Sequence, residues 1–221
     1  MINPVNEIRS IIEQQSDAVW SVADISYSPF KESYTRGIII AQQYRSPLLN
    51  GEYNEEKYHH ILIEAKIAVE DKVNRIRQLL DGYGIKNYVP PASQTDEEAL
   101  RAPFSFKYAA VQGGLGWIGK NGVLVTRQYG PRVRLGAILL NYPLDCGNPV
   151  QDSACGTCTA CADAYPWKLI KGRTWTISTI RDELLDYQSC NKKRSEYIGV
   201  FGRKHECGHC ILACPWGIRE P

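Results

Sequence analysis

The chain has 221 residues, with 26 Lys and Arg against 24 Asp and Glu, so its formal net charge is only +2. This near-zero net charge gives no indication of strong electrostatic binding to nucleic acid. No apolar run approaches the roughly eighteen residues of a membrane-spanning helix, and the first residues lack the basic and apolar regions of a signal peptide. We therefore expect a cytoplasmic globular protein, in which cysteines rarely form disulfides.

Hydrophobic spacing divides most of the chain into helices and strands. Apolar residues three and four apart indicate helices, and β-branched or alternating runs indicate strands. The predicted helices are residues 5–15, 55–80, 97–101 (a single turn) and 104–112, and the predicted strands are 19–25, 37–44, 88–91, 122–126 and 133–140.

The last two predicted strands are separated by a loop that contains Gly130 and Pro131, which is typical of a β-hairpin. Arg132 and Arg134 flank this loop. They could bind an anion, but paired arginines at a turn more often face water. We favour the solvent-exposed interpretation.

Gly114-Leu-Gly-Trp-Ile-Gly119 matches the G-x-G-x-x-G spacing of dinucleotide-binding folds. That fingerprint needs a strand before it and a helix after it, whereas here a predicted helix precedes and a strand follows. No acidic residue stands about twenty positions further on to bind a ribose. Two interpretations remain: a glycine turn that packs closely, or bare backbone that a large flat ligand approaches. Trp117 and Lys120 would add a stacking face and a cation to such a ligand site.

All eight cysteines lie in the last third of the chain. Two tight runs, Cys155-Gly-Thr-Cys158-Thr-Ala-Cys161 and Cys207-Gly-His-Cys210-Ile-Leu-Ala-Cys214-Pro215, contain six of them. Zinc held by the paired C-x-x-C units would leave Cys146, Cys161, Cys190 and Cys214 unexplained. C-x-x-C-x-x-C with a distant C-P is the spacing that holds a cubane iron–sulfur cluster. Cys155, Cys158, Cys161 and Cys214 are therefore a complete predicted ligand set for one [4Fe–4S] cluster.

A second cluster has three cysteine candidates, Cys190, Cys207 and Cys210. In two-cluster ferredoxins the fourth ligand is a cysteine that follows the first run just before a proline. Here Tyr165 occupies that position, before Pro166. Cys146 would complete the set, and we favour it slightly. The alternatives are an oxygen ligand such as Tyr165, a three-cysteine cluster, or no second cluster.

Together, the glycine segment, the strand before residue 140 and the two cysteine runs resemble epoxyqueuosine reductase. This is a cobalamin- and iron–sulfur-dependent family of tRNA modification that is related to the reductive dehalogenases. The resemblance runs from about Val19 to Trp216. It implies an α+β fold, with a nitroreductase-like α/β sandwich over residues 1–144 that binds a corrinoid and a ferredoxin-like two-cluster domain over residues 145–221. It places Gly116, Trp117, Gly119 and Lys120 on the corrinoid side.

The resemblance implies an iron–sulfur oxidoreductase that passes electrons through [4Fe–4S] clusters to bound cobalamin for substrate reduction. Its expected partners are a redox donor such as ferredoxin or flavodoxin and a small-molecule or nucleoside substrate. The alternative is an electron-transfer protein without a substrate of its own.

The chain departs from the family in ways that bear on its substrate. Pro90 stands where the family has its proton-donating Asp, and Asp96, Glu97 or a tyrosine could take that role. The chain ends soon after Trp216, without the family's C-terminal repeats that help to hold tRNA. A short, diverged relative for which tRNA is a doubtful partner is therefore expected.

Overall fold

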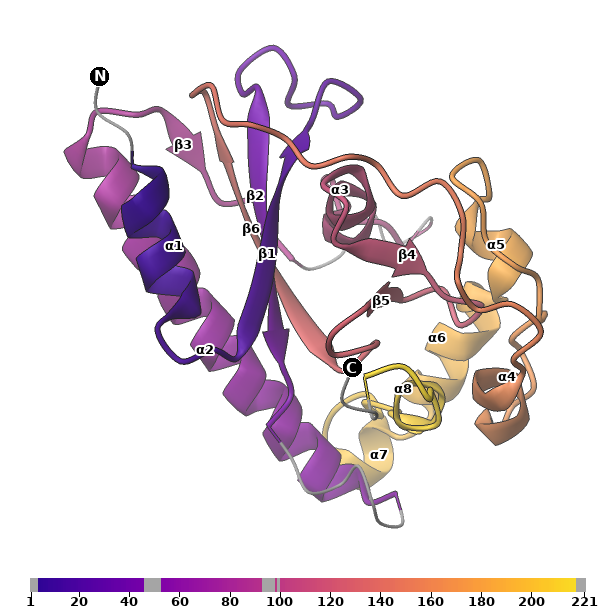
Figure 1. The fold of residues 1–221 in the computed structure, drawn as a ribbon. Helices are drawn as coiled ribbons and strands as arrows, with labels where there is room; N and C mark the ends of the chain where they lie inside the picture. The colour runs from indigo at the N-terminus through magenta and orange to yellow at the C-terminus, as the bar shows by residue number, and fades with distance from the viewer. Residues whose placement is uncertain (1–3, 46–52, 93–97, 99, 218–221) are drawn as a thin grey trace. The chain divides into compact units, whose positions relative to one another are not determined.

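The structure, a computed structural model, describes residues 4–45, 53–92, 98 and 100–217. Two compact units share the chain (Figure 1). The first comprises Met1–Gln43, Glu64–Leu115 and Val133–Val150, and the second comprises Tyr44–Ile63, Gly116–Arg132 and Gln151–Pro221. The predicted contiguous domains, 1–144 and 145–221, stay a prediction, because compactness alone does not tell which segments fold independently.

The first unit is built on an antiparallel sheet with the strand order β1-β2-β6-β3. The strands are β1 (Ala18–Asp24), β2 (Arg36–Gln43), β3 (Asn87–Tyr88) and β6 (Val133–Leu140). The β-branched run of β2 is buried almost throughout because it pairs on both sides, with β1 and with β6. In the second pairing Ile39 lies opposite Ala137.

Helices cover both faces of this sheet. Figure 1 shows α1 (Val5–Glu13) and the later turns of α2 (Glu55–Gly82) over one face, and α3 (Phe106–Gln112) over the other. The core under α1 and α2 is apolar and includes Ile8, Ile38, Ile40, Val69, Ile76 and Ile138. At Gly136 a Cβ would lie 2.6 Å from a methyl carbon of Val69, so a glycine in β6 lets α2 pack directly on the sheet.

A buried polar group interrupts this core. The Lys72 ammonium of α2 lies 3.1 Å from the Asp17 carboxylate and donates to the Gln42 side-chain oxygen at 2.7 Å. All three residues are at most 5% exposed. The attraction among these three side chains offsets the cost of taking them out of water. Removing one of them should therefore destabilise the fold.

In its described residues, the second unit contains a short hairpin, five short helices and the first turns of α2. Strands β4 (Gly116–Ile118) and β5 (Leu124–Thr126) pair with each other. The helices are α4 (Ala160–Ala164), α5 (Arg181–Leu184), α6 (Tyr187–Ser195), α7 (Ile198–Phe201) and α8 (His209–Leu212). Asp186 caps α6 by accepting the backbone N–H of Ser189, and Gly202 ends α7 in the left-handed conformation.

Most predicted elements are confirmed, but one pairing is wrong. The helices at 5–15, 55–80 and 104–112 and the strands at 19–25, 37–44 and 133–140 are present with small changes at their ends. The predicted turn at 97–101 lies partly outside the described residues. The predicted hairpin does not form: β5 pairs with β4, while β6 pairs with β2 and β3. The chain is thus a mixed α/β protein, and no helix in its described part has the length and apolarity needed to cross a membrane.

Candidate metal centre

The first cysteine set gathers at the start of α4 and the end of α8, two helices that pack together. Cys155 and Cys158 lie in the turn before α4, Cys161 lies in that helix, and Cys214 follows α8. Burial raises the pKa of the Cys161 thiol to about 11, with further increases from Cys155, Cys214 and Cys158. The four cysteines therefore lie in one unit, at two helices that pack together, and their binding of a cluster stays a prediction.

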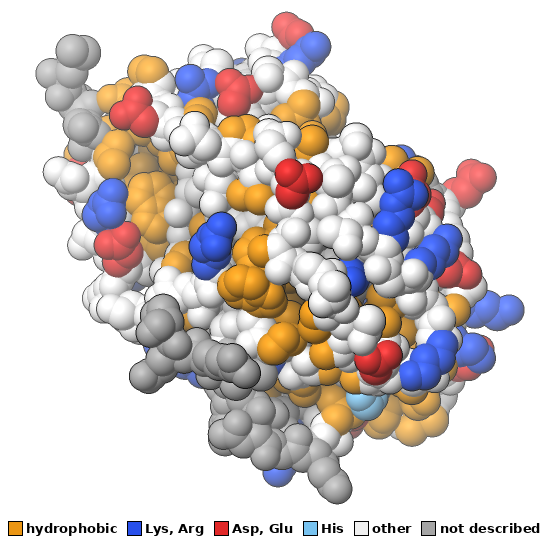
Figure 2. Space-filling model, turned by 45° about the vertical axis from the view of Figure 1, so that its right-hand side comes forward, with side chains coloured by type: hydrophobic (Ala, Val, Ile, Leu, Met, Phe, Trp, Pro, Cys, Tyr) orange, Lys and Arg blue, Asp and Glu red, His pale blue; other side chains and the backbone are white. Residues whose placement is uncertain are grey.

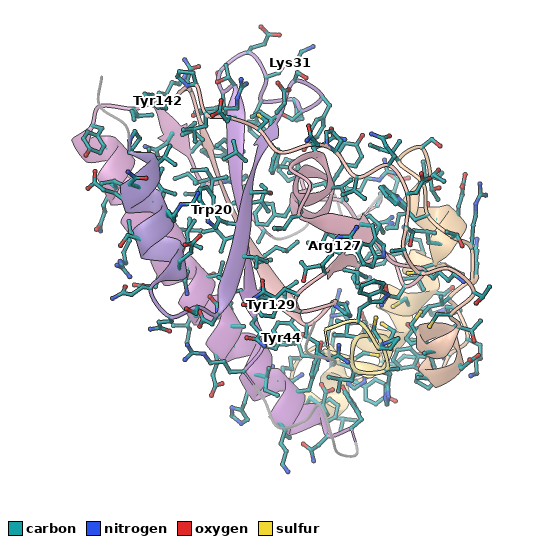
Figure 3. The ribbon with its side chains drawn as sticks, in the orientation of Figure 1. Trp20, Lys31, Tyr44, Arg127, Tyr129 and Tyr142 are labelled. Atoms are coloured by element: carbon teal, nitrogen blue, oxygen red, sulfur yellow. The ribbon has the colours of Figure 1, made fainter. Side chains whose placement is uncertain are left out.

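The second set lies among α4, α6 and α8. Cys190 is in α6, and Cys207 and Cys210 lie before and within α8. Burial raises the pKa of Cys207 to about 11, and Cys190 adds to the increase. Cys190 and Cys207 share an apolar cluster with Tyr165, Ile170 and Leu185. Figure 3 shows yellow sulfur atoms among these helices.

Tyr165 and Cys146 are the two predicted candidates for the missing ligand. The Tyr165 hydroxyl donates to the Cys190 sulfur at 2.8 Å, and Tyr165 is 2% exposed. Cys146 belongs to the first unit and is exposed. The groups that act on its thiol, after burial, are Arg36, Asp24 and Asp145. Only Tyr165 therefore shares a unit with Cys190, Cys207 and Cys210.

No three His, Cys, Asp or Glu side chains among the described residues are arranged to hold a metal ion. In a cubane cluster each thiolate binds a different iron atom, so its ligands surround a larger body than one ion.

Backbone N–H groups are directed at the sulfur atoms in both sets. Such hydrogen bonds come from Ala162 to Cys161, from His209 to Cys207 and from Trp216 to Cys214, and each lowers the thiol pKa against the larger effect of burial. Hydrogen bonds of this kind stabilise negative charge on a cluster ligand.

Side chains from the hairpin segment hold the backbone of the cysteine loops. The Lys120 ammonium donates to the Cys158 carbonyl at 3.0 Å, and the Asn121 amide donates to the Cys210 carbonyl at 3.2 Å. Lys120 is 5% exposed. A predicted corrinoid-side cation is therefore engaged with a cysteine loop of its own unit.

Arg132 is buried, so the solvent-exposed interpretation of this residue is wrong. Its Nη1 donates to the Trp216 carbonyl at 2.7 Å, and its Nη2 donates to the carbonyls of Leu212 at 2.8 Å and Cys214 at 2.7 Å. Burial lowers the pKa of the guanidinium, and nearby Cys214 opposes that shift. Arg132 therefore ties the chain around Cys214 to the segment after β5. Sequence reasoning missed this role because the accepting carbonyls carry no signature in the sequence.

A second group missed from the sequence surrounds Glu55 at the start of α2. Its carboxylate accepts from the Tyr53 hydroxyl at 2.5 Å, from Arg203 at 2.8 Å and from the Glu206 backbone N–H at 3.0 Å. The His205 Nδ1 lies 2.6 Å from the same carboxylate. Burial alone would raise the pKa of Glu55, but these hydrogen bonds outweigh it and lower the pKa to about 2. Glu55 thus anchors the residues that lead into Cys207.

The glycine segment, residues 114–119, is a turn only at its ends, because its middle part, Gly116–Ile118, forms β4. A Cβ on Gly116 would lie 2.1 Å from the Val125 carbonyl oxygen, and one on Gly119 would lie 2.7 Å from the Asn121 side-chain oxygen. Both glycines therefore have packing roles within the hairpin. Trp117 is 1% exposed and meets Trp216 edge-on at 4.7 Å, with Arg127 5.9 Å from its ring. Their predicted contact with a corrinoid stays a prediction.

The fold places the chain among two groups of solved reductases. An epoxyqueuosine reductase from Bacillus subtilis aligns with a TM-score of 0.59 and 18% identity, covering 98% of this chain and 66% of that one. A catabolic reductive dehalogenase aligns with a TM-score of 0.71 and 14% identity, covering 96% of this chain and 31% of that one. At these identities the likeness establishes the fold alone.

Comparison of amino-acid sequences finds curated relatives among the epoxyqueuosine reductases. Curated relatives named epoxyqueuosine reductase include one from Leadbetterella byssophila, 31% identical over 175 residues that cover 77% of this chain and 52% of the relative. Another, from Lactococcus garvieae, is 26% identical over 197 residues that cover 85% of this chain and 47% of the relative. No family model matches. The predicted resemblance to epoxyqueuosine reductases is therefore confirmed, and the chain spans about half the length of the curated relatives it matches.

Proposed function

We propose that this protein is an iron–sulfur oxidoreductase that passes electrons through two clusters to a corrinoid. The observation that carries the proposal is the gathering of Cys155, Cys158, Cys161 and Cys214 in a chain related to epoxyqueuosine reductases. In this proposal the first unit corresponds to a nitroreductase-like sandwich and the cysteine-rich part of the second unit to a ferredoxin-like domain.

The residues present fit iron–sulfur clusters. When bound, a cluster supplies one-electron transfer at the potential that its surroundings set. The thiols would hold it, and the apolar group around Tyr165 and Ile170 would keep water from the second set. Lys120, Asn121 and Arg132 would hold the loops that position the thiols.

Support for cobalamin comes from the resemblance more than from this chain's geometry. A solved reductive dehalogenase with the same fold, at a TM-score of 0.68, is described as suggesting a mechanism for B12-dependent dehalogenation. Here Gly116 and Gly119 already face atoms of their own hairpin. The Trp117 indole N–H, buried without a partner in the described part of the chain, is the group that we assign to the corrinoid side.

The substrate and partners belong to the proposal as well. A solved epoxyqueuosine reductase with this fold, at a TM-score of 0.59, contains an epoxyqueuosine-modified tRNA stem loop. Nothing in the comparisons supports the expected doubt about tRNA, so we include a modified stem loop among the candidate substrates, with free nucleosides and other small molecules. The charged side chains in view in Figure 2 are of both signs and interspersed. As the electron donor we propose a ferredoxin or flavodoxin.

Anaerobic reconstitution of the full chain with iron, sulfide and hydroxocobalamin tests the proposal. We expect iron and sulfide to be retained after desalting, with the EPR signal of a reduced [4Fe–4S] cluster, and corrin absorption that changes when a reduced flavodoxin is added. A Cys158→Ser variant should lose the first cluster, while Lys31→Ala serves as a surface control. Clusters without retained corrin would instead identify an electron carrier, and a chain without clusters would refute both.

A further inference from the structure

Tyr165 stands out because its buried hydroxyl has only a weak partner. It is 2% exposed, and the sulfur of Cys190, at 2.8 Å, is the acceptor found for its hydroxyl in the described part of the chain. Thiol sulfur is a weak acceptor, and buried tyrosine hydroxyl groups usually find a strong one. A polar group at this position is therefore poorly satisfied by the residues that the structure describes.

The backbone fixes the direction of this side chain. Tyr165 follows the last residue of α4 and adopts an extended conformation, with φ −79° and ψ 113°. Pro166 explains this, because a residue before proline is driven out of the helical region. The ring then packs in the apolar cluster with Ile170 and Leu185 and meets Trp167 edge-on at 5.4 Å. Packing on several sides keeps the hydroxyl oxygen directed at the second cysteine set.

The hydroxyl lies within the second cysteine set. Its oxygen is 2.8 Å from the Cys190 sulfur, Cys207 belongs to the same buried cluster, and Cys210 packs against that cluster. An oxygen atom thus stands within this set and within a single unit, where a two-cluster ferredoxin would place its fourth cysteine.

We propose that the Tyr165 oxygen is the fourth protein ligand of the second cluster. This rests on the proposed function, because it presupposes that the second cluster forms. On binding, the O–H bond breaks, an O–Fe bond forms and the proton leaves to solvent, with no change in electron count. The second cluster thus has three thiolates and one phenolate, and Cys146 is not a ligand.

A harder oxygen ligand gives this cluster properties that the first cluster lacks. A phenolate bound to ferric iron absorbs visible light by charge transfer, so excitation in that band enhances the vibrations of the tyrosine ring. Phenolate also stabilises ferric iron better than thiolate does, since hard ligands favour the harder metal ion. The second cluster should be harder to reduce than the same cluster with four thiolates.

Resonance Raman spectroscopy of the reconstituted full-length protein tests the assignment. The oxidised wild-type protein should show tyrosine ring modes that shift when ring-deuterated tyrosine is incorporated. In Tyr165→Phe these modes should disappear, and on brief exposure to air the iron content should fall from about eight to about seven atoms per chain as one iron loses its protein ligand. Tyr165→Cys should restore the iron content without the ring modes, and its second cluster should be reduced more easily.

The control variants separate the remaining outcomes. Cys146→Ala should leave the iron content, the ring modes and both reduction potentials unchanged; loss of the second cluster in this variant would overturn the proposal in favour of Cys146. Wild-type clusters without ring modes would also overturn it, even if Tyr165→Phe shifts the potential, because a hydrogen bond to Cys190 would produce that shift alone. If Tyr165→Phe does not fold, the ring modes of the wild-type protein still decide. Failure of the wild-type protein to bind any cluster would refute the proposed function itself.

Discussion

Replacing Arg132 should loosen the chain around Cys214 and release the first cluster. The guanidinium is 2% exposed and donates to three carbonyls, those of Leu212, Cys214 and Trp216. Arg132→Ala removes this donor from all three carbonyls. Arg132→Lys keeps the charge, but an ammonium cannot reproduce the planar fork that reaches several acceptors at once.

The expected cost follows from the hydrogen bonds. Hydrogen bonds to charged groups contribute about 1.5–3 kcal/mol each, and three that share one donor group do not add fully. A destabilisation of about 4 kcal/mol is therefore expected for Arg132→Ala. For a chain of this size that corresponds to a fall in Tm of about 10 °C. Arg132→Lys should lie between this variant and the wild-type protein.

Two measurements check the effect of Arg132. Thermal unfolding of the iron-free protein, followed by circular dichroism, reports the stability, and iron analysis after anaerobic reconstitution reports cluster retention. Arg134→Ala is the matched control, since Arg134 flanks the same turn. Equal iron content and a Tm within about 2 °C of wild type in Arg132→Ala would refute the role assigned to these hydrogen bonds.

Three further predictions concern other parts of the fold. Lys72→Met should cost about 3–5 kcal/mol in urea unfolding because it removes the cation paired with the buried Asp17 carboxylate, and the double variant with Asp17→Asn should recover most of the loss. Gly116→Ala should lower the Tm by several degrees, since its Cβ would lie 2.1 Å from a carbonyl oxygen, whereas Gly199→Ala, where the space is open, should not. Because the folded pKa of Glu55 is about 2, below its unfolded value, its stabilisation is present above about pH 4.5. This stabilisation, about 2 kcal/mol after solvent screening, should fade as the pH falls toward 2, and Glu55→Gln should remove that part of the pH dependence.

Local patterns were sufficient for most elements but not for their partners. The helical spacing that predicts α2 depends on neighbouring residues, and the structure contains the helix over Glu55–Gly82. Strand pairing depends on surfaces that meet only in the fold. β6 therefore joins β2 rather than the adjacent β5, and β4 arises from a segment whose glycines obscure the strand preference of Trp117 and Ile118.

The candidate site likewise contains residues that the sequence could predict and residues that it could not. The cysteine runs could be found because their ligands are a few residues apart in the chain. The residues that hold these runs could not, because they act on backbone groups far away: Glu55 and its partner Glu206 are 151 residues apart, and Arg132 and its partner Trp216 are 84 apart. A backbone donor or acceptor can belong to almost any residue type, so the sequence carries no trace of such a pairing.

These supporting residues share one physical effect on the cysteine loops. Lys120 and Arg132 hold carbonyls of the first set, those of Cys158 and Cys214, and Asn121 holds the Cys210 carbonyl in the second. In the same loops, N–H groups such as that of Trp216 donate to sulfur. The carbonyl and the N–H of a peptide group point in opposite directions. When a cation or an amide holds the carbonyl, the N–H is therefore free to face a cysteine sulfur. Since N–H···S bonds favour the more negative, reduced state of a cluster, these side chains should raise the reduction potential as well as hold the fold.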